Sequence, residues 1–240
     1  KAMPQKLHTA ILRFPHLRFS PAAGHKLRGY FARLFGSDSD LFHQHESGGK
    51  TIYRYPLIQY KVAGGEPLLL GIGEGATEII RHFRQIEALE LDGKRYLLDH
   101  KHLHSEHYSI GFLSGMQRDY VFRTYWMALN QANYARYRGS LPEEQRALLN
   151  RLLTANILSA YKGMGIKLSL EERLEVKGKF TERITQFKNQ RMMVFSGGFR
   201  VNAALPPLAG LGKSVARGFG AVSVSDQHSQ KNPPKILHST

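Results

Sequence analysis

Apolar residues in the first part of the chain recur with the spacing of strands and helices in turn. In residues 24–35 they return after three, four, seven and eight positions, which is typical of an amphipathic helix, and Gly36 marks its end. Runs rich in β-branched and aromatic residues on either side are typical of strands. The pattern predicts a strand at 6–16, a helix at 24–35, a strand at 51–62, a short strand at 68–70 and a helix at 75–89.

This order of strand, helix, strand, strand and helix is that of a ferredoxin-like unit without its closing strand. The closing strand is predicted somewhere between residues 86 and 98. The glycines at 71–76 match the spacing of a dinucleotide-binding turn, but the surrounding elements do not form an alternating strand–helix series. We interpret them as a tight turn before the second helix.

The second part of the chain combines helices with a hairpin. Pro142 and Glu143 suit the first turn of a helix, because proline and acidic residues are favoured there. The predicted elements are an aromatic core helix at 120–137, a helix at 140–161, a hairpin of strands at 174–183 and 191–203, and a last strand at 221–224. The chain thus divides into halves of similar size near residue 93, with a polar tail at 226–240.

The charge of the chain narrows the class of partner. Its 34 Lys and Arg against 19 Asp and Glu give a formal net charge of +15, which points to nucleic acid first and an anionic membrane surface second. No apolar run is long enough to span a bilayer, so no membrane partner is expected. The chain has no cysteine, which excludes disulfides and thiolate metal sites and is compatible with the cytoplasm.

A glycine-rich segment at 209–220 is the most distinctive motif. It reads G-x-G, a five-residue basic insert, and G-x-G again, with the glycines Gly210, Gly212, Gly218 and Gly220. Lys213 and Arg217 lie four residues apart in the insert, and cations beside close-approaching backbone amides suit a phosphate chain. Pro207 occupies the first-glycine position of a mononucleotide loop, which excludes that motif. A flexible glycine hairpin is the alternative interpretation.

This segment resembles the glycine-rich loop near the C-terminus of the repeat-associated RNA-binding superfamily, and most of all that of the CRISPR repeat-processing endoribonucleases. The resemblance implies an α+β fold of tandem ferredoxin-like (RRM-like) domains, the second irregular with additional helix. The loop would precede the last strand of the second domain, as residues 221–224 do here. The implied domains are residues 1–93 with the catalytic loop and residues 94–225 with the glycine-rich loop.

The resemblance also implies where the catalytic groups lie. In this family a catalytic histidine lies at the end of the first helix or just after it, and one branch uses a His-x-His pair. His43 and His45 have that spacing and follow Gly36. Tyr30 and Lys50 match positions where other members have tyrosine or lysine. These four residues are the predicted catalytic set.

Elementary RNA chemistry is consistent with that set. The 2′-hydroxyl of RNA is its own nucleophile, so cleavage needs a base, an acid and a cation, and two histidines can make both proton transfers. Lys50 would stabilise the charged phosphorane. The hypothesis is cleavage without metal or cofactor that leaves a 2′,3′-cyclic phosphate and a 5′-hydroxyl. His25, at the start of the first helix, is a second candidate base.

The RNA surface is predicted to be wider than the catalytic site. Basic residues crowd the second-half hairpin, and alternation puts Lys177 and Lys179 on one face of its first strand, with Arg191 on the second. By resemblance, CRISPR repeat RNA would contact these residues, Lys213 and Arg217. Such phosphate contacts give affinity rather than sequence choice.

Two other functions stay open at this point. A guide-RNA-binding subunit of an effector complex would keep the glycine-rich loop and basic surface but would need no histidine pair. A zinc-dependent nuclease would use the histidines at 100, 102, 104 and 107, three of which share one face of a strand. The aromatic segment 120–137 could serve a homodimer as well as a core.

Overall fold

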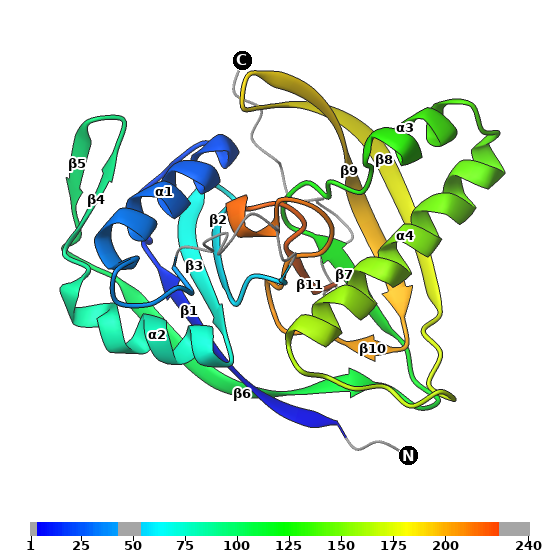
Figure 1. Cartoon of the computed structure of the whole chain (residues 1–240), viewed down its shortest axis with the longest axis horizontal. Coiled ribbons are helices and arrows are strands. Elements are labelled where there is room, and N and C mark those ends of the chain that lie inside the picture. Colours follow the sequence, from blue (N-terminus) through cyan, green and yellow to red (C-terminus); the bar gives the residue numbers. More distant parts are fainter. Residues whose placement is uncertain (1–3, 43–53, 226–240) are drawn as a thin grey trace.

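The computed structural model describes residues 4–42 and 54–225 of the chain. Two sheets stand side by side, and a long strand along the lower edge of Figure 1 links them. The strands are β1 (Gln5–Arg13), β2 (Ile58–Ala63), β3 (Glu66–Ile72), β4 (Ala88–Leu91), β5 (Lys94–Leu97), β6 (His102–Phe112), β7 (Arg118–Phe122), β8 (Val176–Phe187), β9 (Gln190–Val201), β10 (Ala203–Ala204) and β11 (Val222–Val224). The helices are α1 (Gly24–Phe35), α2 (Glu74–His82), α3 (Gln131–Arg138) and α4 (Pro142–Gly163), with 3₁₀ turns η1 (Pro21–Ala23), η2 (Phe83–Gln85) and η3 (Val215–Arg217).

The first sheet confirms the ferredoxin-like order β6-β1-β3-β2, and the short strand β10 from the second half is added at its edge beside β6, with every pair antiparallel. Helix α1 forms at the predicted residues, because its periodic apolar side chains pack against the sheet. Helix α2 begins at the turn after β3, where Gly73 adopts a φ of 56°. The predicted strand at 51–62 forms from Ile58 onward.

The closing strand was predicted in the wrong place. Residues 86–98 form the hairpin β4–β5, whose two strands pair only with each other, and β6 closes the sheet along the full length of β1. Strand β4 packs beside α1 and buries Leu89. Its apolar residues therefore pack against the helix and do not extend the edge of the sheet. The predicted division near residue 93 falls in the turn of this hairpin, and the first sheet continues beyond it.

The second sheet repeats the order of the first, as β11-β7-β9-β8. Helices α3 and α4 form its first crossover, and the glycine-rich segment with η3 takes the place of the second crossover helix. The helix predicted at 120–137 is wrong: β7 and an extended segment precede α3. Trp126 lies in that segment, fully buried, and its backbone N–H and C=O both bond to Phe195 of β9, at 2.8 and 2.9 Å.

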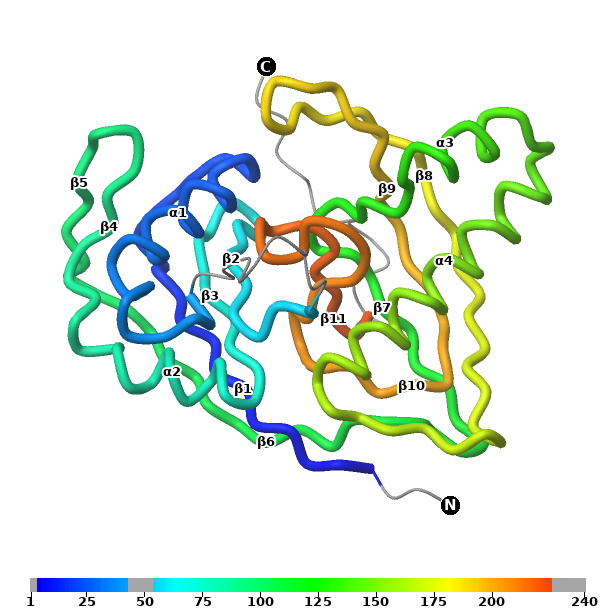
Figure 2. The backbone as a smooth tube through the Cα atoms, in the orientation of Figure 1, coloured from blue at the N-terminus to red at the C-terminus, as the bar shows by residue number. Residues whose placement is uncertain are grey.

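The hairpin of β8 and β9 confirms the predicted one and is longer. Its turn consists of Lys188 and Asn189, both with positive φ, which is the geometry of a tight two-residue hairpin turn. Figure 2 shows the hairpin as a long projection of the second half. Phe187, the last residue of β8, therefore lies at its tip.

The first sheet is buried on both faces, which places the two halves against each other. Along β2, Ile58 and Tyr60 pack into the core beneath α1, while Gln59 and Lys61 alternate to the opposite face. That opposite face meets η3 and the glycine-rich loop, residues 209–220. We call this contact the seam. Complete burial of each large side chain in these cores contributes about 2–3 kcal/mol of stability.

Candidate nucleic-acid interface

The glycine-rich loop is held at the seam by two side chains from the first half. The backbone N–H of Gly210 donates to Oε1 of Gln59 at 2.9 Å, and the carbonyl of Gly210 accepts from the hydroxyl of Tyr55 at 2.9 Å. The bond to Gln59 is buried and the bond to Tyr55 is half-buried, so water competes little with the first of them. The first half therefore sets the position of the loop that the second half supplies.

Much of the loop backbone is engaged inside the protein. The amides of Leu211, Lys213 and Gly220 donate to the carbonyls of Gly220, Met127 and Tyr125, at 2.9, 2.9 and 2.8 Å. These three amides are therefore already paired within the protein. The glycines instead allow close packing and left-handed backbone: Gly212 has a φ of 93° beside the indole of Trp126.

Alanine at Gly220 is expected to lower the free energy of unfolding by about 3 kcal/mol or more. Its φ is +71°, and an added methyl group would lie 1.9 Å from the carbonyl oxygen of Leu211. Gly64 is the matched control, since its φ is +60° but no described atom lies within 4 Å of the added carbon. Alanine there should cost only about 1 kcal/mol in urea unfolding. Equal losses at both positions would contradict the packing argument.

A cluster of aromatic rings and cations surrounds the hairpin tip at the seam. The ring of Phe187 meets those of Phe219 and His25 edge to face, with centroids 5.1 and 6.1 Å apart. The Arg217 guanidinium lies over the same ring at 6.0 Å, and the Lys188 ammonium at 5.9 Å. Rings and cations together suit bases and phosphates of a nucleic acid.

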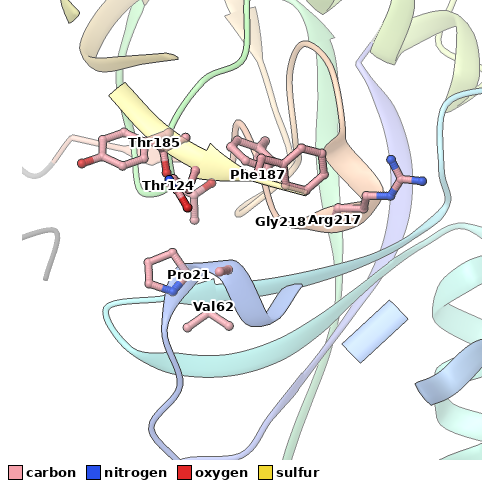
Figure 3. A pocket seen from close by; sticks show the side chains of 11 residues that line it. Pro21, Val62, Thr124, Thr185, Phe187, Arg217 and Gly218 are labelled. Atoms are coloured by element: carbon pink, nitrogen blue, oxygen red, sulfur yellow. The ribbon is translucent and has the colours of Figure 1, made fainter. Parts of the chain in front are cut away.

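Three of these side chains, those of Phe187, Arg217 and Phe219, line a pocket that we call the seam pocket. Pro21 and Val62 contribute from the first half, and Thr124, Phe187, Arg217 and Phe219 from the second. Its volume is about 410 Å³, including the part open to solvent. Figure 3 shows Phe187 on the opposite side of the pocket from Pro21 and Val62, with Arg217 at one end.

Lys61 is the most unusual ionisable group of the seam. Its side chain is fully buried beneath the glycine-rich loop, and its ammonium has no hydrogen-bond partner among the described residues. A methyl group at Gly210 would lie 3.1 Å from Nζ, which shows how closely the loop covers it. Burial lowers the pKa of Lys61 from 10.5 to about 7. Below that pH the buried amine is charged, and burying this charge destabilises the folded state.

The predicted catalytic histidines lie outside the described residues, as does Lys50. Tyr30 is described: its hydroxyl donates to the carbonyl of Ala88 in β4 at 2.9 Å. Burial, and then Glu90, raise the pKa of the Tyr30 hydroxyl. It therefore keeps its proton at neutral pH and fastens α1 to the β4–β5 hairpin.

The predicted basic residues do not all gather at one place. Lys213 and Arg217 lie at the seam, and Arg191 lies near the hairpin tip, paired in register with Gln186. Lys177 and Lys179 are exposed on one face of β8, as expected, but eight to ten residues from Phe187. At about 3.3 Å per residue that is about 30 Å, so they form a separate basic area.

The histidines of β6 and its neighbours do not converge. His8 and His107 stack with centroids 4.6 Å apart, and His104 pairs with Glu106 at 3.0 Å. In residues 4–42 and 54–225, no three His, Cys, Asp or Glu side chains are grouped as a metal site would require. The zinc-nuclease hypothesis thus gains no support from the described residues.

The functional surface includes residues that sequence reasoning missed. Phe187, Phe219, Gln59 and Tyr55 were not singled out, although they shape the seam pocket or hold the loop. The sequence signals for these residues were weak: Phe219 lies inside the glycine motif, and Phe187 directly precedes a Lys-Asn pair.

Within the described parts of the chain, no helix is both long and apolar enough to cross a bilayer.

Comparison with known proteins identifies relatives over nearly the whole chain. A family model described as the Cas6b N-terminal domain matches residues 5–109, and one described as the Cas6b C-terminal domain matches residues 113–225. A crystal structure of Cas6b is 31% identical with a TM-score of 0.84, and covers 92% of this chain and 100% of that one. A crystal structure of the CRISPR RNA processing endoribonuclease Cas6b is 31% identical with a TM-score of 0.74 over the same shares.

A curated relative comes from Methanocaldococcus jannaschii. The uncharacterized protein MJ0978 of that organism is 30% identical over 146 residues, which are 60% of this chain and 95% of the relative. The two family models meet between residues 109 and 113, at the end of β6. The matched regions therefore correspond to the two sheets, apart from β10, which lies in the second region but pairs with β6 of the first sheet.

Proposed function

The chain belongs to the Cas6b family of CRISPR RNA processing endoribonucleases, and we propose that it cleaves precursor RNA within CRISPR repeats by attack of the RNA's own 2′-hydroxyl. The observation that carries the proposal is the Cas6b likeness itself, at 31% identity and a TM-score of 0.84 over 92% of the chain. The basic charge of +15 and the cation-rich seam are consistent with a polyanionic substrate.

In the proposed reaction, His43 and His45 make the two proton transfers. One imidazole accepts the 2′-hydroxyl proton as the oxygen attacks phosphorus, and the other gives a proton to the departing 5′-oxygen. The bond from phosphorus to the 5′-oxygen breaks, which leaves a 2′,3′-cyclic phosphate and a 5′-hydroxyl. Lys50 stabilises the phosphorane charge. Tyr30 takes no proton transfer here, because its hydroxyl is bonded to Ala88 and its pKa is raised.

The residues on either side of the histidine segment are anchored. Phe42 is buried, and its carbonyl accepts from the hydroxyl of Tyr60 at 3.2 Å. Tyr55 bonds to Gly210 of the glycine-rich loop at 2.9 Å. Phe42 and Tyr55, which flank the histidine segment in the sequence, therefore lie at the first core and at the seam, which supports the proposal that catalysis and RNA binding are neighbours.

The proposal predicts cleavage of a cognate CRISPR repeat RNA in the presence of EDTA. A second repeat with one 2′-deoxy residue at the scissile position should bind equally well and stay intact, because the nucleophile is gone. The products are checked for a cyclic phosphate by their mobility before and after acid treatment. Tight binding without cleavage would favour the guide-RNA-binding subunit instead.

The predicted contacts with effector-complex subunits and with a second copy of the chain stay predictions.

A further inference from the structure

We propose that the seam pocket binds one unpaired base of the RNA, stacked on Phe187, with the adjoining phosphate at Arg217. This inference rests on the proposed function, since it takes RNA as the ligand, and it adds a site that reads the base rather than the backbone. The pocket lies where both halves contribute, beside the glycine-rich loop (Figure 3).

Phe187 is not a core residue. In the described parts of the chain, the buried side chains form two clusters, and neither includes Phe187 or Phe219. Both rings are only half-buried, and they meet edge to face at 5.1 Å with an interplanar angle of 82°. An aromatic ring exposed in a pocket of a basic protein is the platform on which unpaired bases stack.

Two cations lie close to the Phe187 ring. The guanidinium of Arg217 lies 6.0 Å from the centre of the Phe187 ring, at the outer limit of a cation–π contact. The ammonium of Lys188 lies at 5.9 Å from the same ring. A base stacked on Phe187 therefore has a positive charge within reach of its phosphate, and a planar guanidinium is well suited to hold it.

The pocket also has a polar lining, to which Thr124, Thr185 and Gln186 contribute. Figure 3 shows the two threonines on the side away from Pro21 and Val62. The Thr124 oxygen accepts from the N–H of Ala221 at 2.9 Å, which leaves its hydroxyl hydrogen to donate elsewhere. A hydroxyl donor and a carboxamide can together pair with the edge of a base.

The seam pocket is open to solvent, so a base would lie against Phe187 at its mouth rather than inside a closed cavity. A base reaches this ring only when it is unpaired and unstacked. RNA recognised in this way must be single-stranded at that nucleotide.

A double-mutant cycle between protein and RNA tests the inference. The probe is a cognate CRISPR repeat RNA in which each base in turn is replaced by an abasic site, bound to wild type and to Phe187→Leu. At one nucleotide, loss of the base should weaken binding to wild type about tenfold, since base–aromatic stacking has that effect. In Phe187→Leu the same loss should change binding less than about twofold.

The control variant alters the same hairpin but leaves the seam pocket unchanged. Phe180 lies on β8 with its ring 5.0 Å from Trp126, so Phe180→Leu removes an equal amount of ring away from the pocket. That variant should keep the full tenfold effect at the same nucleotide. If the abasic profile of Phe187→Leu equals that of wild type, Phe187 only anchors the two halves and the inference is overturned while cleavage stands. A wild-type chain that neither binds nor cleaves the repeat would overturn the proposed function as well.

Discussion

Alanine at His43 or at His45 is expected to slow single-turnover cleavage of the repeat RNA by about 10²- to 10⁴-fold. Each imidazole makes one of the two proton transfers, so neither loss should be recovered by the other. Affinity for the RNA should stay within about twofold of wild type, because the many Lys and Arg residues elsewhere on the chain supply most of the phosphate contacts. Rates are measured with enzyme in excess, so that product release does not mask the chemical step.

The pH profile distinguishes a catalytic role from a structural one. Wild type should show a bell-shaped rate, since one imidazole must be neutral and the other protonated, and each alanine variant should lose one limb of the bell. His100→Ala and His102→Ala serve as controls, because these residues are exposed on or near β6. Full activity in His43→Ala and His45→Ala would transfer the role to another group. His25 would be the next candidate, since its buried Nδ1 has no hydrogen-bond partner among the described residues.

Local patterns predicted the elements whose apolar faces are continuous. Helix α1 formed at the predicted residues because one stripe of it meets a single core. The prediction was wrong where a segment serves two neighbours. Residues 86–98 were expected to close the first sheet, but Leu89 packs beneath α1. Trp126 was predicted in a helix, but its backbone pairs with Phe195. Such choices depend on tertiary contacts that periodicity does not contain.

The candidate site was predictable in part for the same reason. The spacing of the glycines located the loop, because only glycine leaves room where the backbone packs closely against neighbouring atoms. It did not show that Gln59 and Tyr55 hold the loop from the other half, a contact that spans about 150 residues. Alternation along β2 explains the result afterwards: one face joins the α1 core, and the opposite face supplies Gln59 and Lys61 to the seam.

The buried cation of Lys61 ties the stability of the chain to pH. Its pKa is lowered from 10.5 to about 7 by burial, and in the unfolded chain the amine returns to its ordinary value. Between those values the unfolded chain holds a proton that the folded chain has lost, so the free energy of unfolding rises with pH by about 1.4 kcal/mol per pH unit. Below about pH 7 the amine is charged in both states, and the folded state bears the full cost of burying it.

Methionine at Lys61 is therefore expected to stabilise the chain by several kcal/mol at about pH 6 and to abolish the rise between about pH 7 and pH 9. Urea unfolding of both proteins across this range measures the difference. The range stops below pH 10, because burial raises the pKa of Tyr55 and Tyr60 and their titration acts in the opposite sense. Lys167→Met, at an exposed lysine, should leave the slope unchanged. Parallel curves for wild type and Lys61→Met would mean that the ammonium is paired or hydrated beneath the loop.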